Sequence, residues 1–142
     1  MMVATMAYAL WQRGTTPVFA AVRFEIRLAE DQPTPGLIVA QVEQSARLVY
    51  LHPEIVVGND DVAEASVAQD GVQVAINVRF LPPGASRLQQ ATAAHVDRPM
   101  AILIDGRVMM TPTVRAPAGE WAIITGPFSR ADAERIAEGI RK

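Results

Sequence analysis

The chain has 142 residues, of which half are apolar and a fifth are charged, and its formal net charge is −2. This length is that of one ordinary domain, and the composition is that of a globular protein rather than a disordered one. The absence of cysteine excludes disulfides, thiolate zinc sites and cysteine nucleophiles. The small net charge gives no basic footprint for nucleic acid or for an anionic membrane surface.

The first 19 residues are expected to lie outside the fold, which leaves one domain over residues 20–142. The run from Val3 to Trp11 is apolar, and Val18-Phe19-Ala20 resembles a small-x-small cleavage site. However, no positive charge precedes the run, as a signal peptide requires. A poor signal peptide, the tail of a truncated membrane segment and a flexible leader all remain open. No run in the sequence approaches the roughly 20 apolar residues that span a bilayer.

The first part of the domain is expected to consist of strands and turns. Residues 22–28 alternate apolar and charged side chains, which predicts a strand with one buried and one wet face. The prolines and glycine of residues 30–36 predict a loop. Residues 37–42 are apolar without a clear period, so a loop and a weak strand both remain open. A short strand is expected over residues 48–51, ended by His52-Pro53.

Gly58-Asn59-Asp60-Asp61 predicts a turn that leads into a helix. Asp60 or Asp61 is suited to cap a short helix over about residues 62–65, because a carboxylate accepts hydrogen bonds from first-turn amides. A strand is then expected over residues 66–69, and Asp70-Gly71 is typical of a hairpin turn. Residues 72–80 alternate apolar and other side chains throughout, which predicts the clearest strand of the chain.

The second half is expected to contain two helices and a hairpin. A helix is predicted from the prolines at 82–83 to about Val96, with Leu88, Thr92 and His95 on one face. The apolar run of residues 100–104 suits a central strand.

Asp105-Gly106 fits a type I′ turn, from which residues 107–110 return. A further strand is expected over residues 121–125. Ser129 is then suited to cap a last helix, whose core-facing stripe is Ala133, Ile136, Ala137 and Ile140.

These elements predict an α+β fold with an antiparallel sheet of about six strands and two amphipathic helices packed on one of its faces. The tight turns between neighbouring strands are the reason for the antiparallel arrangement.

The residue patterns predict no catalytic, metal or cofactor site. The only histidines, His52 and His95, are interpreted as structural or surface residues. The acidic pairs Glu30-Asp31 and Asp60-Asp61 are adjacent in the chain, so they are interpreted as a solvated loop and a cap rather than facing catalytic carboxylates. Neither phosphate-binding glycine motif occurs.

Several ordered motifs carry a family resemblance. They are the F-x-P-x-G of Phe80, Pro82 and Gly84, Ala91-Thr92, the hairpin from Met100 to Val108, Pro112, the ITG-x-F of residues 124–128, the terminal helix, and DDVAEA at residues 60–65. Together they resemble the head subdomain of the first large periplasmic region (P1) of SecD, a membrane protein that assists the Sec translocon. The resemblance covers the second half of the chain well and its beginning poorly.

This resemblance implies a non-enzymatic binding module of the cell envelope, without cofactors, that contacts an extended or unfolded polypeptide or another envelope protein. An extended segment can pair with an exposed strand edge, and flexible methionines suit apolar binding. We therefore expect Val108, Met109 and Met110 to contribute to partner binding. The resemblance also implies a periplasmic or other extracytoplasmic location, while a cytoplasmic location remains open.

Two other functions remain open. One is a small ligand-binding domain or enzyme with a site in the proline-rich loops 30–36 and 112–120, where Arg115 and Glu120 are the polar candidates. The other is a sensory ectodomain of a longer membrane protein. Trp121 fits either a core aromatic or a surface anchor.

Overall fold

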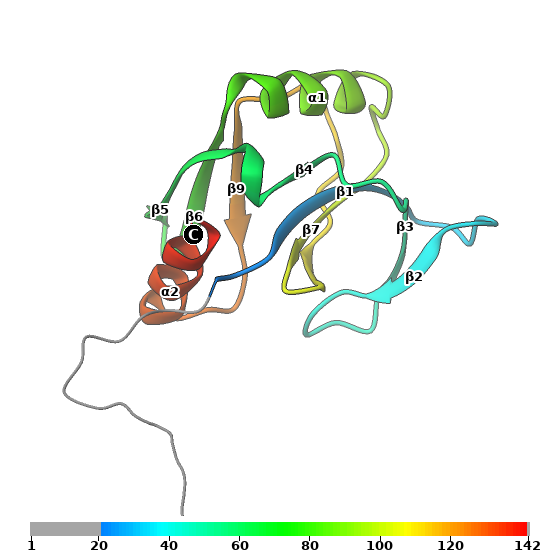
Figure 1. Cartoon of the computed structure of the whole chain (residues 1–142). Coiled ribbons are helices and arrows are strands. Elements are labelled where there is room, and N and C mark those ends of the chain that lie inside the picture. The colour runs from blue at the N-terminus through cyan, green and yellow to red at the C-terminus, as the bar shows by residue number, and fades with distance from the viewer. Residues whose placement is uncertain (1–20, 142) are drawn as a thin grey trace, which may run out of the picture.

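The structure is a computed structural model that describes residues 21–141 (Figure 1). This part of the chain contains nine strands, two α-helices and one 3₁₀ turn, η1 (Asn59–Asp61). The strands are β1 (Phe24–Glu30), β2 (Ile38–Gln41), β3 (Leu48–Leu51), β4 (Val57–Gly58), β5 (Val62–Asp70), β6 (Gln73–Phe80), β7 (Met100–Ile104), β8 (Arg107–Met110) and β9 (Trp121–Thr125). The helices are α1 (Pro82–Ala93) and α2 (Arg130–Ile140).

β1 and β7 form the centre of a six-stranded antiparallel sheet. Its order is β2-β3-β1-β7-β8, and β4 also pairs with β1. β7 is apolar along its length because both of its faces are buried. Ile102, which pairs with Ile26, and Ile104 face the main core, whereas Ala101 and Leu103 face a second, smaller core. The central strand predicted from this apolar run is confirmed.

The edge of β1 opposite β7 carries β3 and β4, which are separated at His52-Pro53. A proline has no N–H to donate, so the strand ladder stops there. The guanidinium of Arg27 spans the interruption, and its Nη1 donates to the carbonyl oxygens of His52 at 3.2 Å and Pro53 at 2.6 Å. The end of β3 therefore lies where the sequence predicted it.

The six-stranded sheet curls until its two end strands meet. Val42, just after β2, forms a bridge with Val108 of β8, and the N–H of Glu43 donates to the carbonyl of Val108 at 2.8 Å. The smaller core fills this curl and consists of Ala29, Val49, Leu51, Ala101, Leu103 and Val108. Residues 37–42, for which a loop and a weak strand were both open, thus contain a paired strand.

The second sheet has three antiparallel strands in the order β5-β6-β9. The alternation predicted for residues 72–80 is confirmed at Ile76, Val78 and Phe80, which are buried, but Val72 is exposed in the turn before β6 and Ala75 on the other face is also buried. Within β9, Ile124 is fully buried whereas Ile123 is 53% exposed, so the two side chains lie on opposite faces.

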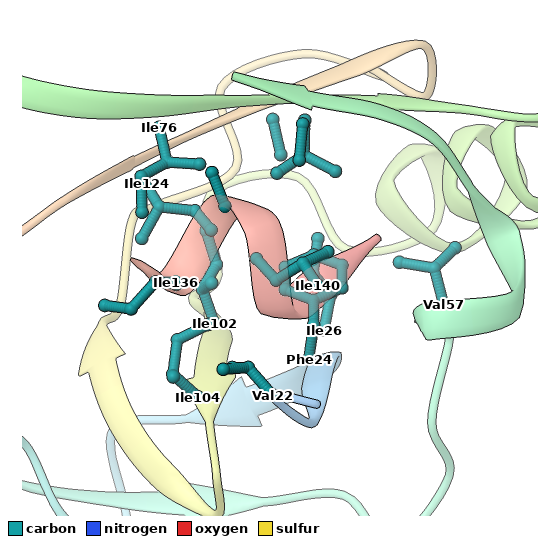
Figure 2. Packing of buried hydrophobic residues seen from close by; sticks show 14 of the residues in the cluster. Val22, Phe24, Ile26, Val57, Ile76, Ile102, Ile104, Ile124, Ile136 and Ile140 are labelled. Carbon is teal, nitrogen blue, oxygen red and sulfur yellow. The ribbon is translucent and has the colours of Figure 1, made fainter. Parts of the chain in front are cut away.

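The main core lies between the two sheets and is completed by α2. Figure 2 shows Ile136 and Ile140 of this helix gathered with Ile102 and Phe24 of one sheet and Ile124 of the other. The apolar stripe predicted for the last helix therefore faces the core, and all four of its residues are buried.

Both helices begin where the sequence predicts. α1 begins at Pro82, whose fixed φ suits a first helical turn. It ends at Ala93, short of the predicted end near Val96; the N–H of His95 then donates to the carbonyl of Thr92, and the chain turns at Asp97, whose φ is 68°. α2 is capped as predicted, since the hydroxyl of Ser129 accepts the N–H of Asp132 at 3.1 Å.

The short helix predicted over about residues 62–65 is wrong. These residues begin β5, which pairs with β6 along its length. Asp61 accepts the N–H of Gly58 at 3.0 Å, so its carboxylate closes the 3₁₀ turn η1 instead of capping an α-helix. Asn59 ties the same turn to β1 by accepting the N–H of Phe24 at 2.8 Å. The extended strand pairing outweighs the local capping signal.

The predicted α+β class, with antiparallel strands and a sheet of about six strands, is confirmed. The strands divide between two sheets, a division that the sequence did not reveal. α2 contacts β5 and β6, whereas α1 contacts β4 and η1, so the helices cover different parts of the fold (Figure 1).

The expected leader over residues 1–19 lies outside the described part of the chain. Among residues 21–141, no helix has both the length and the apolar character needed to cross a bilayer.

Candidate functional site

The hairpin of β7 and β8 positions the residues that the sequence singled out for binding. Asp105 and Gly106 have φ of 51° and 82°, as the predicted type I′ turn requires. The N–H of Asp105 donates to the carbonyl of Arg23 at 2.8 Å, and its carboxylate accepts the N–H of Arg23 at 2.9 Å. Asp105 thus holds the hairpin against the beginning of β1.

β8 contains a bulge at Met109. Val108 pairs with Leu103 and Met110 pairs with Ile102, so Met109 is an extra residue without a partner on β7. A bulge interrupts the alternation of side chains and re-aims them. As a result, Met109 and Met110 both pack against the main core, and both are partly buried. Strict alternation along β8 would instead place one of the two methionines inside and the other outside.

The three residues expected to bind a partner therefore differ in accessibility. Val108 is buried in the smaller core, and its carbonyl oxygen accepts a hydrogen bond from the N–H of Glu43. The sulfur of Met110 accepts the N–H of Thr125 at 3.4 Å. Met109 lines a cavity beside the hairpin.

This cavity has a volume of about 430 Å³ and lies between the β7–β8 hairpin, the turn after β2 and the beginning of α2. Its apolar lining is Ile104, Met109, Pro127, Phe128 and Ile136, and its polar lining is Glu43, Gln44, Asp105, Arg107, Asp132 and Arg135. The volume lies within the roughly 300–1,000 Å³ of ligand pockets, but six of the eleven lining residues are polar, so the cavity is more polar than a usual small-molecule site.

The charges around the cavity are paired with one another. Arg107 lies 3.8 Å from Glu43, and Arg135 lies 3.6 Å from Asp132. These pairs are exposed enough for water to screen them, so each side chain is free to rearrange around a bound group. The cavity therefore combines apolar walls with an adaptable charged rim.

Residues 37–142 match the family model described as SecDF, P1 head subdomain. The chain belongs to this family. It is 39% identical over 93 residues to the protein translocase subunit SecD of Rhodobacter capsulatus. This match covers 63% of this chain and 17% of that protein. It is 28% identical over 134 residues to the protein translocase subunit SecDF of Thermus thermophilus. This match covers 82% of this chain and 18% of that protein. The chain thus spans less than a fifth of the length of either relative.

Two solved SecDF structures resemble the P1 head chain in fold. A crystal structure of SecDF in the super-membrane-facing form has a TM-score of 0.71 and 23% identity, and covers 87% of this chain and 19% of that chain. A structure of SecDF as a membrane component that enhances protein export has a TM-score of 0.70 and 22% identity, and covers 87% of this chain and 63% of that chain. The resemblance that the motifs of residues 80–140 carried is confirmed and extends back to residue 37.

The outer face of β9 in this P1 head carries an exposed apolar pair. Trp121 is 49% exposed and Ile123 is exposed beside it, so Trp121 lies on the surface rather than in the core. β9 pairs only with β6 in the described sheet, which leaves its other edge without a strand partner there. This edge is a second place where an extended segment can be tested for pairing.

The loops 30–36 and 112–120 present their polar candidates to solvent. Arg115 and Glu120 are both exposed. The beginning of the second loop extends the β7 ladder, since the N–H of Met100 donates to the carbonyl of Pro112 at 3.0 Å. Its end is held by Thr92, whose hydroxyl donates to the carbonyl of Ala118 at 3.0 Å. The contacts of loop 112–120 are therefore those of a connection that fastens α1 to the sheet.

Both histidines lie close to the carboxylate of Glu30, and the sequence did not predict this grouping. Nε2 of His52 lies 2.8 Å from its carboxylate and Nε2 of His95 lies 3.8 Å away, while Arg98 donates to both of its oxygens. Burial raises the pKa of Glu30, but hydrogen bonds from Arg98 and His52 and the charge of Arg98 outweigh it and hold this pKa below its usual value of 4.5. Glu30 is thus a paired carboxylate, not a solvated loop residue.

Proposed function

We propose that this P1 head is a non-enzymatic binding module of the cell envelope, in an extracytoplasmic location, that holds an apolar side chain of an extended polypeptide in the cavity beside Met109. The observation that carries the proposal is the cavity itself, which opens next to the bulged strand and has apolar walls. An extended chain places alternate side chains on one side, so one such side chain can enter while its neighbours meet the charged rim.

The family supports this function. The two relatives are protein translocase subunits, and one solved neighbour is a membrane component that enhances protein export. A polypeptide in transit through such machinery is unfolded and exposes apolar side chains that water solvates poorly. A shallow site with flexible methionine and adaptable charges tolerates many sequences, as a general export component requires.

The three residues expected from the sequence take different parts in this proposal. Met109 is the contact residue, because it lines the cavity. Met110 supports the bulge through its contact with Thr125. Val108 anchors the strand by its buried side chain and its bonded carbonyl. Binding at this place uses the wall of the hairpin rather than a free edge of β8.

Two matched peptides test the proposal on the ¹⁵N-labelled full chain. One is a ten-residue peptide with leucine at alternate positions, and the other has serine at those positions. We expect the leucine peptide to shift the amide signals of Gln44, Arg107, Met109 and Phe128, and the serine peptide to leave them in place. An unfolded secretory polypeptide is expected to shift the same signals, and its folded form is not.

The Met109→Gln variant is expected to weaken binding of the leucine peptide about five- to tenfold, because it replaces part of an apolar wall at similar side-chain length. Ile123→Gln is the matched control, since Ile123 is exposed on β9 outside the cavity lining. Equal losses in the two variants, or shifts concentrated at Trp121 and Ile123, would show that the peptide binds at the β9 edge and overturn the cavity assignment. Identical shifts with both peptides would show that no apolar side chain is recognised.

A further inference from the structure

The two histidines of the chain meet at one carboxylate, at the opposite end of β1 from the cavity. The ligand atoms of Glu30, His52 and His95 all lie within 4.8 Å of one another. The imidazole rings stand edge to face with centroids 5.8 Å apart. Because the sequence contains no other histidine, this convergence uses every imidazole that the protein has.

Three separate elements build the group. Glu30 is the last residue of β1. His52 follows β3 and is fixed to β1, since its N–H donates to the carbonyl of Leu28 at 2.9 Å. His95 follows α1, and its N–H donates to the carbonyl of Thr92 at 3.0 Å. The backbone around each ligand is thus held by hydrogen bonds, which limits the reorganisation that a bound ion would demand.

The spacing fits a small divalent ion. Tetrahedral zinc with ligands at about 2.0–2.1 Å separates those ligands by about 3.3 Å. The two imidazole nitrogens lie 2.8 and 3.8 Å from Glu30 Oε2, on either side of that separation. Shifts of about half an ångström bring these two contacts to that separation, while the two imidazole nitrogens, which lie within 4.8 Å of each other, must approach to about 3.3 Å.

The donor types also suit zinc. Two imidazoles and one carboxylate form a known three-residue zinc set that leaves a fourth position for water. His95 is 3% exposed and Glu30 15%, while the His52 side chain is 30% exposed and offers an approach from solvent. We infer that Glu30, His52 and His95 bind one zinc ion and so fasten the ends of β1, β3 and α1 together.

Arg98 is the competitor for this position. Its guanidinium donates to Glu30 Oε1 at 3.2 Å and to Oε2 at 2.5 Å, so a metal ion must displace it. The Arg98 side chain is 51% exposed and can turn into water. Binding at Nε2 of His95 also replaces the hydrogen bond that this atom makes to the carbonyl of Ala29 at 2.9 Å. Both exchanges lower the affinity, so the site is weaker than a dedicated structural zinc site.

The test uses the full chain without a histidine tag, stripped with EDTA and titrated with ZnCl₂. Because the chain has two histidines, its imidazole NMR signals report on this site alone. We expect both imidazoles to shift together to an endpoint of one zinc per chain. Calorimetry should give the same stoichiometry, and zinc should raise the thermal midpoint until EDTA is added.

Substitutions separate this site from adventitious binding. His52→Gln, at a partly exposed position, is expected to lower zinc affinity on the order of 100-fold, and Glu30→Gln by a similar factor. Arg98→Gln is expected to raise zinc affinity about tenfold, because it removes a like charge beside the ion. Glu120→Gln, an exposed carboxylate elsewhere, is the control and should change nothing.

Three outcomes would overturn the inference. They are an absence of imidazole shifts at millimolar zinc, a shift of His52 alone that Glu30→Gln leaves intact, and a fall in affinity in Arg98→Gln. The second outcome would identify binding by a single surface histidine. The first would identify the group as a hydrogen-bonded cluster that serves packing alone.

Discussion

Neighbouring isoleucines on β9 provide a direct test of how the two sheets enclose the core. Ile124 is fully buried and faces Ile76 across the strand pair, whereas Ile123 is 53% exposed on the outer face. Substituting each by alanine makes the same chemical change, in the same strand, one residue apart. Any loss of β propensity is therefore common to both variants, and the difference between them measures burial.

The expected difference follows from the atoms removed. Ile124→Ala removes three buried carbons at about 0.8 kcal/mol each, a transfer term of about 2.4 kcal/mol, and the cavity that remains adds to it. We expect a total loss of about 3–4 kcal/mol in the free energy of unfolding. Ile123→Ala removes side-chain atoms that are already half in water, so its cost should stay below about 1 kcal/mol.

Urea denaturation followed by far-UV circular dichroism measures both variants against the parent chain. The midpoints are to be compared at a shared slope, so that a change in the denatured state is not mistaken for a change in stability. Losses within about 0.5 kcal/mol of each other would refute the assignment of inner and outer faces on β9. A larger loss in Ile123→Ala would place the core on the other side of the sheet.

Three further predictions concern backbone and charge. Gly119→Ala should lower the free energy of unfolding by about 1–3 kcal/mol, because an added Cβ would lie 2.2 Å from the carbonyl oxygen of Ala85. A loss under about 0.5 kcal/mol in urea unfolding would contradict this close approach. Gly106→Ala should lower the free energy of unfolding by about 1–2 kcal/mol, since Gly106 has φ of 82°. Gly106→Asn should lower it by less in the same assay, and equal losses would argue against the turn geometry. The pKa of Glu30 is lowered in the folded state, so its ionised form contributes stability that is complete above the unfolded value near 4.5 and is lost as pH falls through the folded value. Urea midpoints of Glu30→Gln should therefore fall less steeply below pH 5 than those of the parent chain, and parallel curves would contradict the pairing.

Local patterns predicted the elements whose environment is uniform along their length. The apolar run of β7 predicted a central strand, because a strand buried on both faces needs no polar alternation. The stripe of α2 predicted its buried face because a helix that packs on one side repeats its apolar residues every three to four positions. In these cases each residue carries the signal of its own burial.

The sequence misled where a distant partner decides the structure. The acidic pair before Val62 fits a helix cap, and alanines follow it, yet residues 62–70 extend because β6 is available to pair with them. Residues 37–42 could not be assigned from the sequence because their apolar pattern is weak. They form a strand because β3 is available to pair with them. Strand pairing is a long-range energy term, and local propensity gives way to it.

The candidate sites were predicted only in part for the same physical reason. Met109 stood out because methionine is flexible and suits apolar binding, but its cavity is assembled from three segments that only the fold brings together. The histidines gave no signal, since they and Glu30 lie far apart from one another in the sequence. Their meeting at Glu30 depends on the break at Pro53 and on the end of α1.

β1 runs from beside the cavity to the histidine group and keeps the two proposed sites apart. Arg23, just before it, binds the turn residue Asp105 beside the cavity, and Glu30 at its far end holds the histidines. Seven residues of extended chain separate these ends by about 23 Å, well beyond the range of about 7–10 Å within which substitutions usually couple. Met109→Gln should therefore leave zinc-dependent imidazole shifts unchanged, and His52→Gln should leave peptide binding unchanged. Because the two sites are physically independent, failure of either proposal leaves the argument for the other intact.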